Sequence, residues 1–283
     1  MFRKRKMLFC IAAILFAILS LWLAWGNTAL VLNTYRITSG DLPKAFNGFR
    51  IAQVSDLHNA EMGKGNEKLM AMLKEAKPDI IVITGDMIDS RNTKVSVALQ
   101  FAEEAVKIAP CYYISGNHEA RTQEYRVLKE GLRDRGVTVL EDAKAEIEVS
   151  GETITLVGVD DPSFQTDYLF GDDETVMRGK LKDLISEADG YTILLSHRPE
   201  LFEIYAENKV ELIFSGHAHG GQFRLPFVGG LAAPNQGFFP KYDGGIYTEG
   251  NTSMVVSRGV GNSIFPFRVN NRPEVVLVAL CAQ

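Results

Sequence analysis

Cysteine is scarce in this 283-residue chain, and the three present are Cys10, Cys111 and Cys281. Their wide spacing indicates neither a disulfide framework nor a thiolate metal site. The chain also lacks a surplus of positive charge. Residues 3–6 carry +4 of a net charge of −5, so the remainder carries −9 (−5 minus +4). An acidic body of this kind argues against a nucleic-acid partner, because sequence-independent binding to DNA or RNA needs a basic face.

Charge of either sign is absent from residues 7–35. Residues 7–25 are nearly all Leu, Ile, Ala, Phe and Trp, and a helix of that length spans roughly 30 Å of hydrocarbon. Trp22 and Trp25 lie at its far end, where an interfacial belt is expected. The sequence therefore predicts a basic cytoplasmic tip at residues 1–6 and a transmembrane anchor at residues 7–26. By the positive-inside rule, the domain that follows is extracytoplasmic and the protein is a single-pass protein of the cell membrane.

Two other interpretations of the N-terminus stay open. A cleaved signal peptide shares the basic start and the apolar run, although its apolar region is usually shorter. A domain that faces the cytoplasm is the other alternative, and a reporter fused to the C-terminus distinguishes it. The three cysteines do not identify the redox compartment.

Beyond the anchor, residues 27–46 are predicted to form a linker and residues 47–283 a single α/β domain. Apolar runs typical of buried strands alternate with segments of helical spacing. The predicted strands are residues 49–55, 80–84, 111–115, 191–196, 211–215, 254–257 and 275–280, with further short strands between residues 137 and 159. The predicted helices are residues 67–77, 95–109, 122–136, 173–187 and 201–208. Residues 222–250 are rich in Gly, Pro and aromatic side chains and are predicted to be irregular.

Only five histidines are present, and each belongs to a short motif that follows a predicted strand. The motifs are D-L-H from Asp56, G-D-M-I-D from Gly85, G-N-H-E from Gly116, S-H-R-P from Ser196 and G-H-A-H-G-G-Q from Gly216. Because the carboxyl ends of strands in an α/β sheet meet at one crevice, five motifs that are distant in sequence are expected to share one site.

The side chains of these motifs offer carboxylate and amide oxygens and imidazole nitrogens, without thiolate. Such a donor set suits Mn, Fe or Zn. The donors outnumber what one ion needs, so two divalent metal ions that share a bridging carboxylate are expected. Two ions about 3.5–4 Å apart hold a hydroxide and clamp the oxygens of an in-line displacement at phosphorus.

The ordered motifs resemble the calcineurin-like metallophosphoesterase superfamily from about residue 49 to the C-terminus. The extension G-H-A-H-G-G-Q-F-R-L-P, with the later V-S-R-G-V-G and R-P-E-V, is similar to a bacterial membrane-associated branch that includes relatives of UDP-2,3-diacylglucosamine hydrolases. The resemblance implies a four-layer αββα sandwich of two mixed β-sheets. It also implies hydrolysis of a phosphodiester, a phosphomonoester or a pyrophosphate by a metal-bridging hydroxide.

The resemblance assigns a role to each motif residue. The first metal ion would be bound by Asp56, His58 and His219, and the second by Asn117, His197 and His217, with Asp86 bridging both. His118 would act near the leaving oxygen as general acid or transition-state stabiliser, and Asp89 would orient it. Glu119 stands where the family accepts Asp or Glu.

Several alternatives remain at the level of sequence. Asp89 also fits a helix N-cap, and Asp160 and Asp161 are interpreted as turn or capping residues. Arg198 and the arginines of neighbouring loops fit a phosphate clamp and a surface salt bridge equally well. The remaining set, Phe223, Phe227, Phe238 and Phe239, fits either a lid or lipid-facing rim or the packing of a long loop.

For the whole protein, a protein phosphatase and a non-catalytic metal-binding scaffold are the alternative functions. A degenerate scaffold is expected to lose His118 and Asp89 first, and both are present. A site near the membrane makes a lipid-linked or envelope-derived phosphoester one predicted substrate class. The oligomeric state is not predicted by the sequence.

Overall fold

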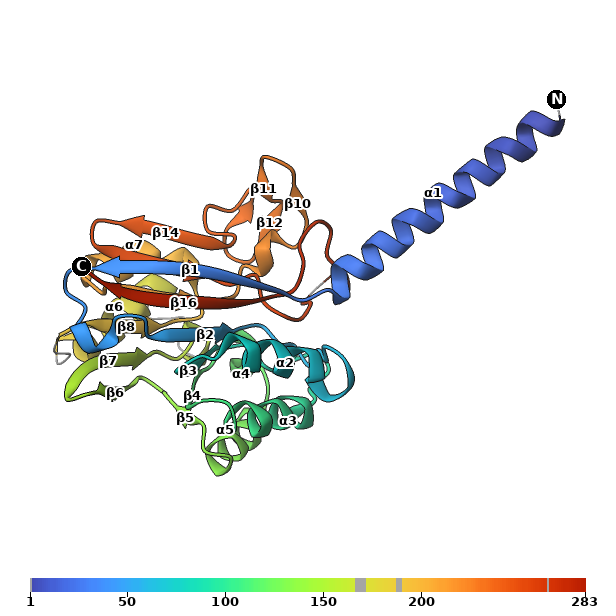
Figure 1. The fold of residues 1–283 in the computed structure, drawn as a ribbon. Coiled ribbons are helices and arrows are strands. Elements are labelled where there is room, and N and C mark those ends of the chain that lie inside the picture. Colours follow the sequence, from blue (N-terminus) through green and yellow to red (C-terminus); the bar gives the residue numbers. More distant parts are fainter. Residues whose placement is uncertain (1, 166–171, 187–189, 264) are drawn as a thin grey trace.

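Two six-stranded β-sheets packed face to face form the body of the protein, and a long helix projects away from it (Figure 1). The computed structural model describes all residues except 1, 166–171, 187–189 and 264. The projecting helix, α1 (Phe2–Thr28), is 27 residues long and is solvent-exposed from residue 3 to residue 22. Its length and hydropathy suffice to cross a membrane.

The first sheet has the strand order β1-β16-β2-β3-β4-β5. Its strands are β1 (Val31–Ser39), β2 (Arg50–Val54), β3 (Ile80–Thr84), β4 (Cys111–Ile114), β5 (Thr138–Val139) and β16 (Glu274–Ala282). All pairs are parallel except β16 with β2. The I-I-V-I-T run of β3 is buried throughout, as expected for a central parallel strand covered on both faces.

The second sheet has the order β14-β15-β9-β8-β7-β6. Its strands are β6 (Ala143–Val149), β7 (Glu152–Gly158), β8 (Thr192–Leu195), β9 (Leu212–Ser215), β14 (Gly245–Glu249) and β15 (Thr252–Val256). Its two outer pairs are antiparallel and its inner pairs are parallel. Both sheets are therefore mixed, as predicted.

Helices cover the outer face of each sheet and complete four layers. The first sheet is covered by α2 (Glu67–Ala76), α3 (Val95–Ala105) and α5 (Tyr125–Asp134), and the second by α6 (Asp173–Ile185) and α7 (Phe202–Glu207). A middle core, which includes Ile51, Val82, Ile193 and Phe214, separates the sheets. The predicted αββα sandwich is confirmed.

The predicted linker differs from the structure. Residues 31–39 form β1, which pairs in parallel with β16 along its whole length. Tyr35 and Ile37 pack against the middle core, whereas Leu32 packs on the helix-covered face. This alternation between two faces with a period of two residues is typical of a strand. It is hard to recognise in the sequence because it directly follows the apolar run of the predicted anchor. The domain therefore begins almost directly after α1.

Residues 222–250 contain little regular structure, as predicted. Four two-residue strands form two small ladders, β10 (Arg224–Leu225) with β11 (Gly229–Gly230) and β12 (Ala232–Ala233) with β13 (Gly237–Phe238). This segment stands above the second sheet on the same side of the body as the end of α1 (Figure 1).

Candidate metal centre

The five histidine motifs lie in loops that follow parallel strands of both sheets. The first three follow β2, β3 and β4 of the first sheet, and the other two follow β8 and β9 of the second. Both sheets of the sandwich therefore contribute residues to the site. The predicted convergence at strand ends therefore takes place, but on two sheets rather than one.

Among the described residues, the donor atoms of these loops form three close groups, two of which share Asp86. These two comprise Asp56, His58, Asp86 and His219, and Asp86, His197 and His217, while the third comprises His58, Asp89 and His118. Within each group, the donor atoms all lie within 4.8 Å of one another. The two groups that share Asp86 contain every predicted ligand except Asn117, with the expected bridging carboxylate in common.

Distances inside the first group indicate a cation site. The Nε2 atoms of His58 and His219 lie 3.1 Å apart, and His219 Nε2 lies 3.2 Å from Asp56 Oδ1. Asp86 Oδ2 lies 3.5 Å from His58 Nε2 and 3.3 Å from His197 Nε2. Carboxylates and imidazoles that face one another in a buried space are the donors that divalent metals prefer.

Unpaired donors fit a metal in the second group. His197 Nδ1 lies 2.7 Å from the carbonyl of Thr84, so in the neutral imidazole Nδ1 carries the proton and Nε2 has the lone pair that a metal needs. Within the part of the chain that the structure describes, His197 Nε2 and Asn117 Oδ1 are buried without a hydrogen-bond partner. Buried polar atoms are rarely left unpaired, and a metal ion would satisfy both. The residues present therefore fit the predicted centre.

Protonation states at the site also favour cations. Burial raises the pKa of Asp86, but the facing imidazoles of His197 and His58 lower it well below its usual range. For His219, burial lowers the pKa to about 3, so its imidazole is neutral. At His197, burial lowers the pKa, but the Asp86 carboxylate raises it to about 10. Protons and divalent cations therefore compete for this imidazole, as at metal sites generally.

The backbone of the motif loops is strained where the donors lie. Five of the seven predicted ligands adopt a left-handed φ, and they are Asp56, His58, Asp86, His217 and His219. Such conformations cost of order 1–3 kcal/mol each and concentrate at functional sites. Gly85 has a φ of +86°, and a Cβ there would lie 2.7 Å from His197 Nδ1. Only glycine allows the loops after β3 and β8 to approach this closely.

Comparison with known proteins decides the family. The profile described as calcineurin-like phosphoesterase matches residues 49–221, which is more than half of the chain. The chain belongs to the calcineurin-like phosphoesterase family. It is a metallophosphoesterase, a hydrolase of phosphoric ester bonds.

Three relatives place it among bacterial and animal metallophosphoesterases. The chain is 30% identical to the metallophosphoesterase YkuE of Bacillus subtilis over 87% of its own length and 84% of that protein. It is 29% identical to the phosphodiesterase YaeI of Escherichia coli, over 82% of each chain. It is 28% identical to a transmembrane protein with metallophosphoesterase domain of Danio rerio, over 84% of its own length and 54% of that protein. The more specific resemblance to UDP-2,3-diacylglucosamine hydrolases stays a prediction.

His118 lies beside the first donor group of this metallophosphoesterase, with its ring centroid 4.6 Å from that of His58. Its Nδ1 accepts a hydrogen bond of 3.0 Å from the backbone N–H of Ser90. The predicted partner Asp89 lies farther away, at 3.7 Å from Nδ1. Both carboxylate oxygens of Asp89 accept hydrogen bonds from Arg91 instead. The nearest contacts to this nitrogen therefore come from Ser90, through its backbone N–H and its hydroxyl oxygen at 3.2 Å, and the orienting role of Asp89 stays a prediction.

Three further groups support the site and were missed or misjudged from the sequence. Glu119 is buried and its carboxylate accepts backbone hydrogen bonds from the Asp86 loop and from its own. Arg198 is neither a surface residue nor a free clamp, because it is buried in a bidentate pair with Asp161. Asn235 Oδ1 lies 3.3 Å from His217 Nε2. The contacts of Arg198 with Asp161 and of Asn235 with His217 join distant segments and leave no mark in local sequence, whereas the contact of Glu119 with Gly116 lies within the G-N-H-E motif.

Proposed function

We propose that this metallophosphoesterase is anchored in the cell membrane by α1 and hydrolyses its phosphoester with two divalent metal ions of the Mn, Fe or Zn type. The main support for two ions is that the carboxylate of Asp86 belongs to both donor groups. A shared carboxylate is what a two-metal site needs. When bound, such a pair of ions activates water and neutralises charge on the phosphoryl oxygens.

The protein itself holds the metal ligands in place and supplies a hydrogen-bond donor at His118. Because Nδ1 accepts from Ser90 N–H, the neutral imidazole carries its proton on Nε2. Burial lowers the pKa of His118, which favours this neutral form. We therefore assign His118 the role of hydrogen-bond donor to the developing charge on the leaving oxygen, in preference to full proton transfer.

The orientation of His118 is held from two sides. Its backbone N–H donates to Asp86 Oδ1 at 2.8 Å, and Ser90 holds the ring. The donor to the leaving oxygen is thereby fixed relative to the carboxylate shared by both metal groups. Preorganised donors of this kind account for a large part of catalysis at charged transition states.

Membrane anchoring is supported by the length and hydropathy of α1 and by a relative named as a transmembrane protein. The basic residues 3–6 support an orientation with the N-terminus in the cytoplasm and the catalytic domain outside. A reporter at the C-terminus tests this orientation, and activity of a cytoplasmic reporter would refute it.

The catalytic proposal is tested with bis(4-nitrophenyl) phosphate and the purified full chain. His118→Ala is expected to lose most of kcat while retaining both metal ions by elemental analysis. His118→Asn, which keeps an N–H donor, is expected to retain more kcat than His118→Ala if donation alone is required. Unchanged turnover in His118→Ala would refute the assignment. Comparison with a lipid pyrophosphate and with phosphomonoesters distinguishes the substrate classes.

A further inference from the structure

Five phenylalanine side chains are exposed in the segment between residues 222 and 268. We define the aromatic rim as Phe227, Phe238, Phe239, Phe265 and Phe267. Phe227 is fully exposed, and Phe238 and Phe239 have exposed fractions of 76% and 61%. Large apolar side chains gathered on one surface mark a contact with a partner or a membrane.

An apolar pocket of about 330 Å³ lies between this rim and the metal centre. Its walls include Phe223, Leu231, Ala232, Ala233, Phe238 and Phe265. His219, a predicted ligand of the first metal, lies at the same pocket. Because Phe238 and Phe265 belong both to the rim and to the walls, the pocket extends from the rim to the loop that bears His219.

Hydrogen bonds and ring contacts tie the rim to the root of α1. Gln222 Nε2 donates to the carbonyls of Phe265 and Phe267, and Phe223 packs against both of these rings. One residue after Phe267, Arg268 and Asn27 exchange two hydrogen bonds, of 2.6 and 2.9 Å. The part of the rim formed by Phe265 and Phe267 is therefore joined to the end of α1 through the neighbouring Arg268.

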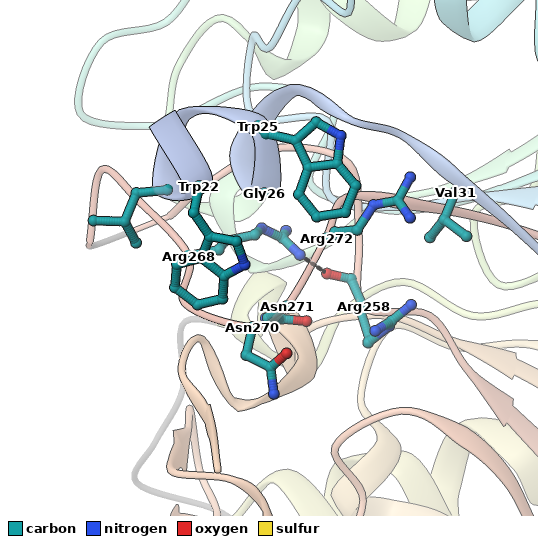
Figure 2. Close-up of a pocket in the computed structure, with 10 residues that line it drawn as sticks. Trp22, Trp25, Gly26, Val31, Arg258, Arg268, Asn270, Asn271 and Arg272 are labelled. Atoms are coloured by element: carbon teal, nitrogen blue, oxygen red, sulfur yellow. Dashed lines mark hydrogen bonds between the residues drawn. The ribbon is translucent and has the colours of Figure 1, made fainter. Parts of the chain in front are cut away.

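Arginine and tryptophan side chains also lie where α1 meets the domain (Figure 2). Arg272 donates to the carbonyls of Ala29 and Leu30, just after α1, and its guanidinium lies 4.8 Å from the Trp25 ring centroid. A helix fixed in this way sets the orientation of the domain toward the bilayer. The short strands β10–β12 then face the membrane side of the molecule, beside the end of α1 (Figure 1).

We propose that the apolar pocket holds an acyl chain of a bilayer lipid whose phosphoester is the substrate, while the aromatic rim rests in the membrane interface. The proposal rests on the phosphoesterase function above and adds the substrate class. Three features favour an acyl chain as the occupant. The pocket is apolar, it opens at the rim near the proposed membrane helix, and it extends to His219. Aromatic side chains favour the bilayer interface.

A series of 4-nitrophenyl alkyl phosphodiesters tests the pocket, using the full chain in lipid nanodiscs. Methyl, butyl and octyl esters share the same reacting phosphorus and leaving group, so only the tail differs. Each buried methylene contributes up to about fourfold. For the unaltered protein, kcat/KM is expected to rise at least about tenfold from methyl to octyl.

The two possible failures give different results. Hydrolysis of the methyl ester without any dependence on tail length would overturn the pocket and leave the phosphoesterase function standing. Absence of hydrolysis for every ester, with metals bound, would overturn the function and the pocket together.

Substitutions in the pocket test whether the dependence on tail length arises there. Ala232→Trp, which fills the pocket, and Phe238→Ser, which removes an exposed wall, are each expected to reduce the octyl-to-methyl ratio of kcat/KM toward one. Asn251→Trp places the same indole on the exposed turn between β14 and β15 and is expected to keep the ratio of the unaltered protein. Because the ratio is taken within each variant, a change in overall activity does not obscure it. An unchanged ratio in both pocket variants would overturn the proposal.

The rim is tested by an environment-sensitive fluorophore on Phe227→Cys, with Cys10 and Cys281 replaced by Ser. Its emission in nanodiscs is expected to shift to shorter wavelength than that of the same label on Asn251→Cys, which lies at the far end of the domain. Equal emission at the two positions would overturn the bilayer contact and the route for the acyl chain.

Discussion

The carboxylate of Glu119 accepts a hydrogen bond of 2.8 Å from the backbone N–H of Asp86. The same oxygen accepts from Gly116 N–H at 2.7 Å, and the other accepts from Ile88 N–H at 3.3 Å. One buried side chain thus joins the loop that bears the shared carboxylate to the loop that bears Asn117 and His118. This connection fixes the Asp86 loop against the loop of Asn117 and His118.

Removal of the Glu119 carboxylate is expected to destabilise the fold. Glu119→Ala leaves three backbone N–H groups without their acceptor, and each buried unsatisfied donor costs about 1–3 kcal/mol. A loss of roughly 3 kcal/mol or more in the free energy of unfolding is expected, measured by denaturant titration of the full chain. Glu103→Ala, at an exposed position of α3, is the control and is expected to change stability by less than about 0.5 kcal/mol. Equal effects at the two positions would contradict this role.

The Arg198–Asp161 pair is expected to behave as a buried ion pair. Arg198 is 2% exposed, and its Nε and Nη2 donate to the two carboxylate oxygens of Asp161 at 2.5 and 2.8 Å. Breaking such a pair on one side costs about 3–5 kcal/mol because a buried charge is left alone. Arg198→Met should therefore cost more than the double variant Arg198→Met/Asp161→Leu. Arg178→Met, which breaks an exposed pair with Glu207, is expected to cost less than about 1 kcal/mol. Simple additivity of the two core substitutions would refute the pairing.

Acid is expected to remove the contribution of Asp161 in a defined window. Burial raises the pKa of this carboxyl, but the hydrogen bond and charge of Arg198 lower it to about 2, against about 3.9 in an unfolded chain. A depressed pKa stabilises the fold above the unfolded value, and this stabilisation is lost as pH falls toward about 2. The stability difference between the unaltered protein and Asp161→Asn should therefore shrink by about 2 kcal/mol between pH 5 and pH 2. A constant difference would contradict the shifted pKa.

Chelation is expected to lower the melting temperature and abolish turnover together. The carboxylates of Asp56 and Asp86 are fully buried in one cluster, and a bound cation stabilises the folded state by mass action. Differential scanning fluorimetry before and after EDTA, and again after Mn or Zn is restored, measures the effect. The melting temperature of an Asp86→Ala variant is expected to respond much less to both steps. If the two proteins responded alike, the cation site would lie elsewhere.

Much of the fold was predictable because its signals are local. The apolar β-branched run of residues 80–84 is a strand with the predicted bounds, and the motif glycines end strands where they were expected to. The edge strand β1 was missed, because its two-residue alternation follows directly on the anchor. Its place beside β16 depends on a partner more than 200 residues away in the chain.

Residue types and their order along the chain determined the anchor-like helix, the α/β class and the set of seven candidate ligands, because each reflects local hydropathy or a motif at a strand end. Only the tertiary structure decided that two sheets supply the donors and that Asp86 is common to both groups. It alone also showed Ser90 rather than Asp89 against His118 Nδ1, and Arg198 buried against Asp161. Hydrogen bonds and ion pairs between distant segments form through space, and nothing in the sequence around either partner specifies them.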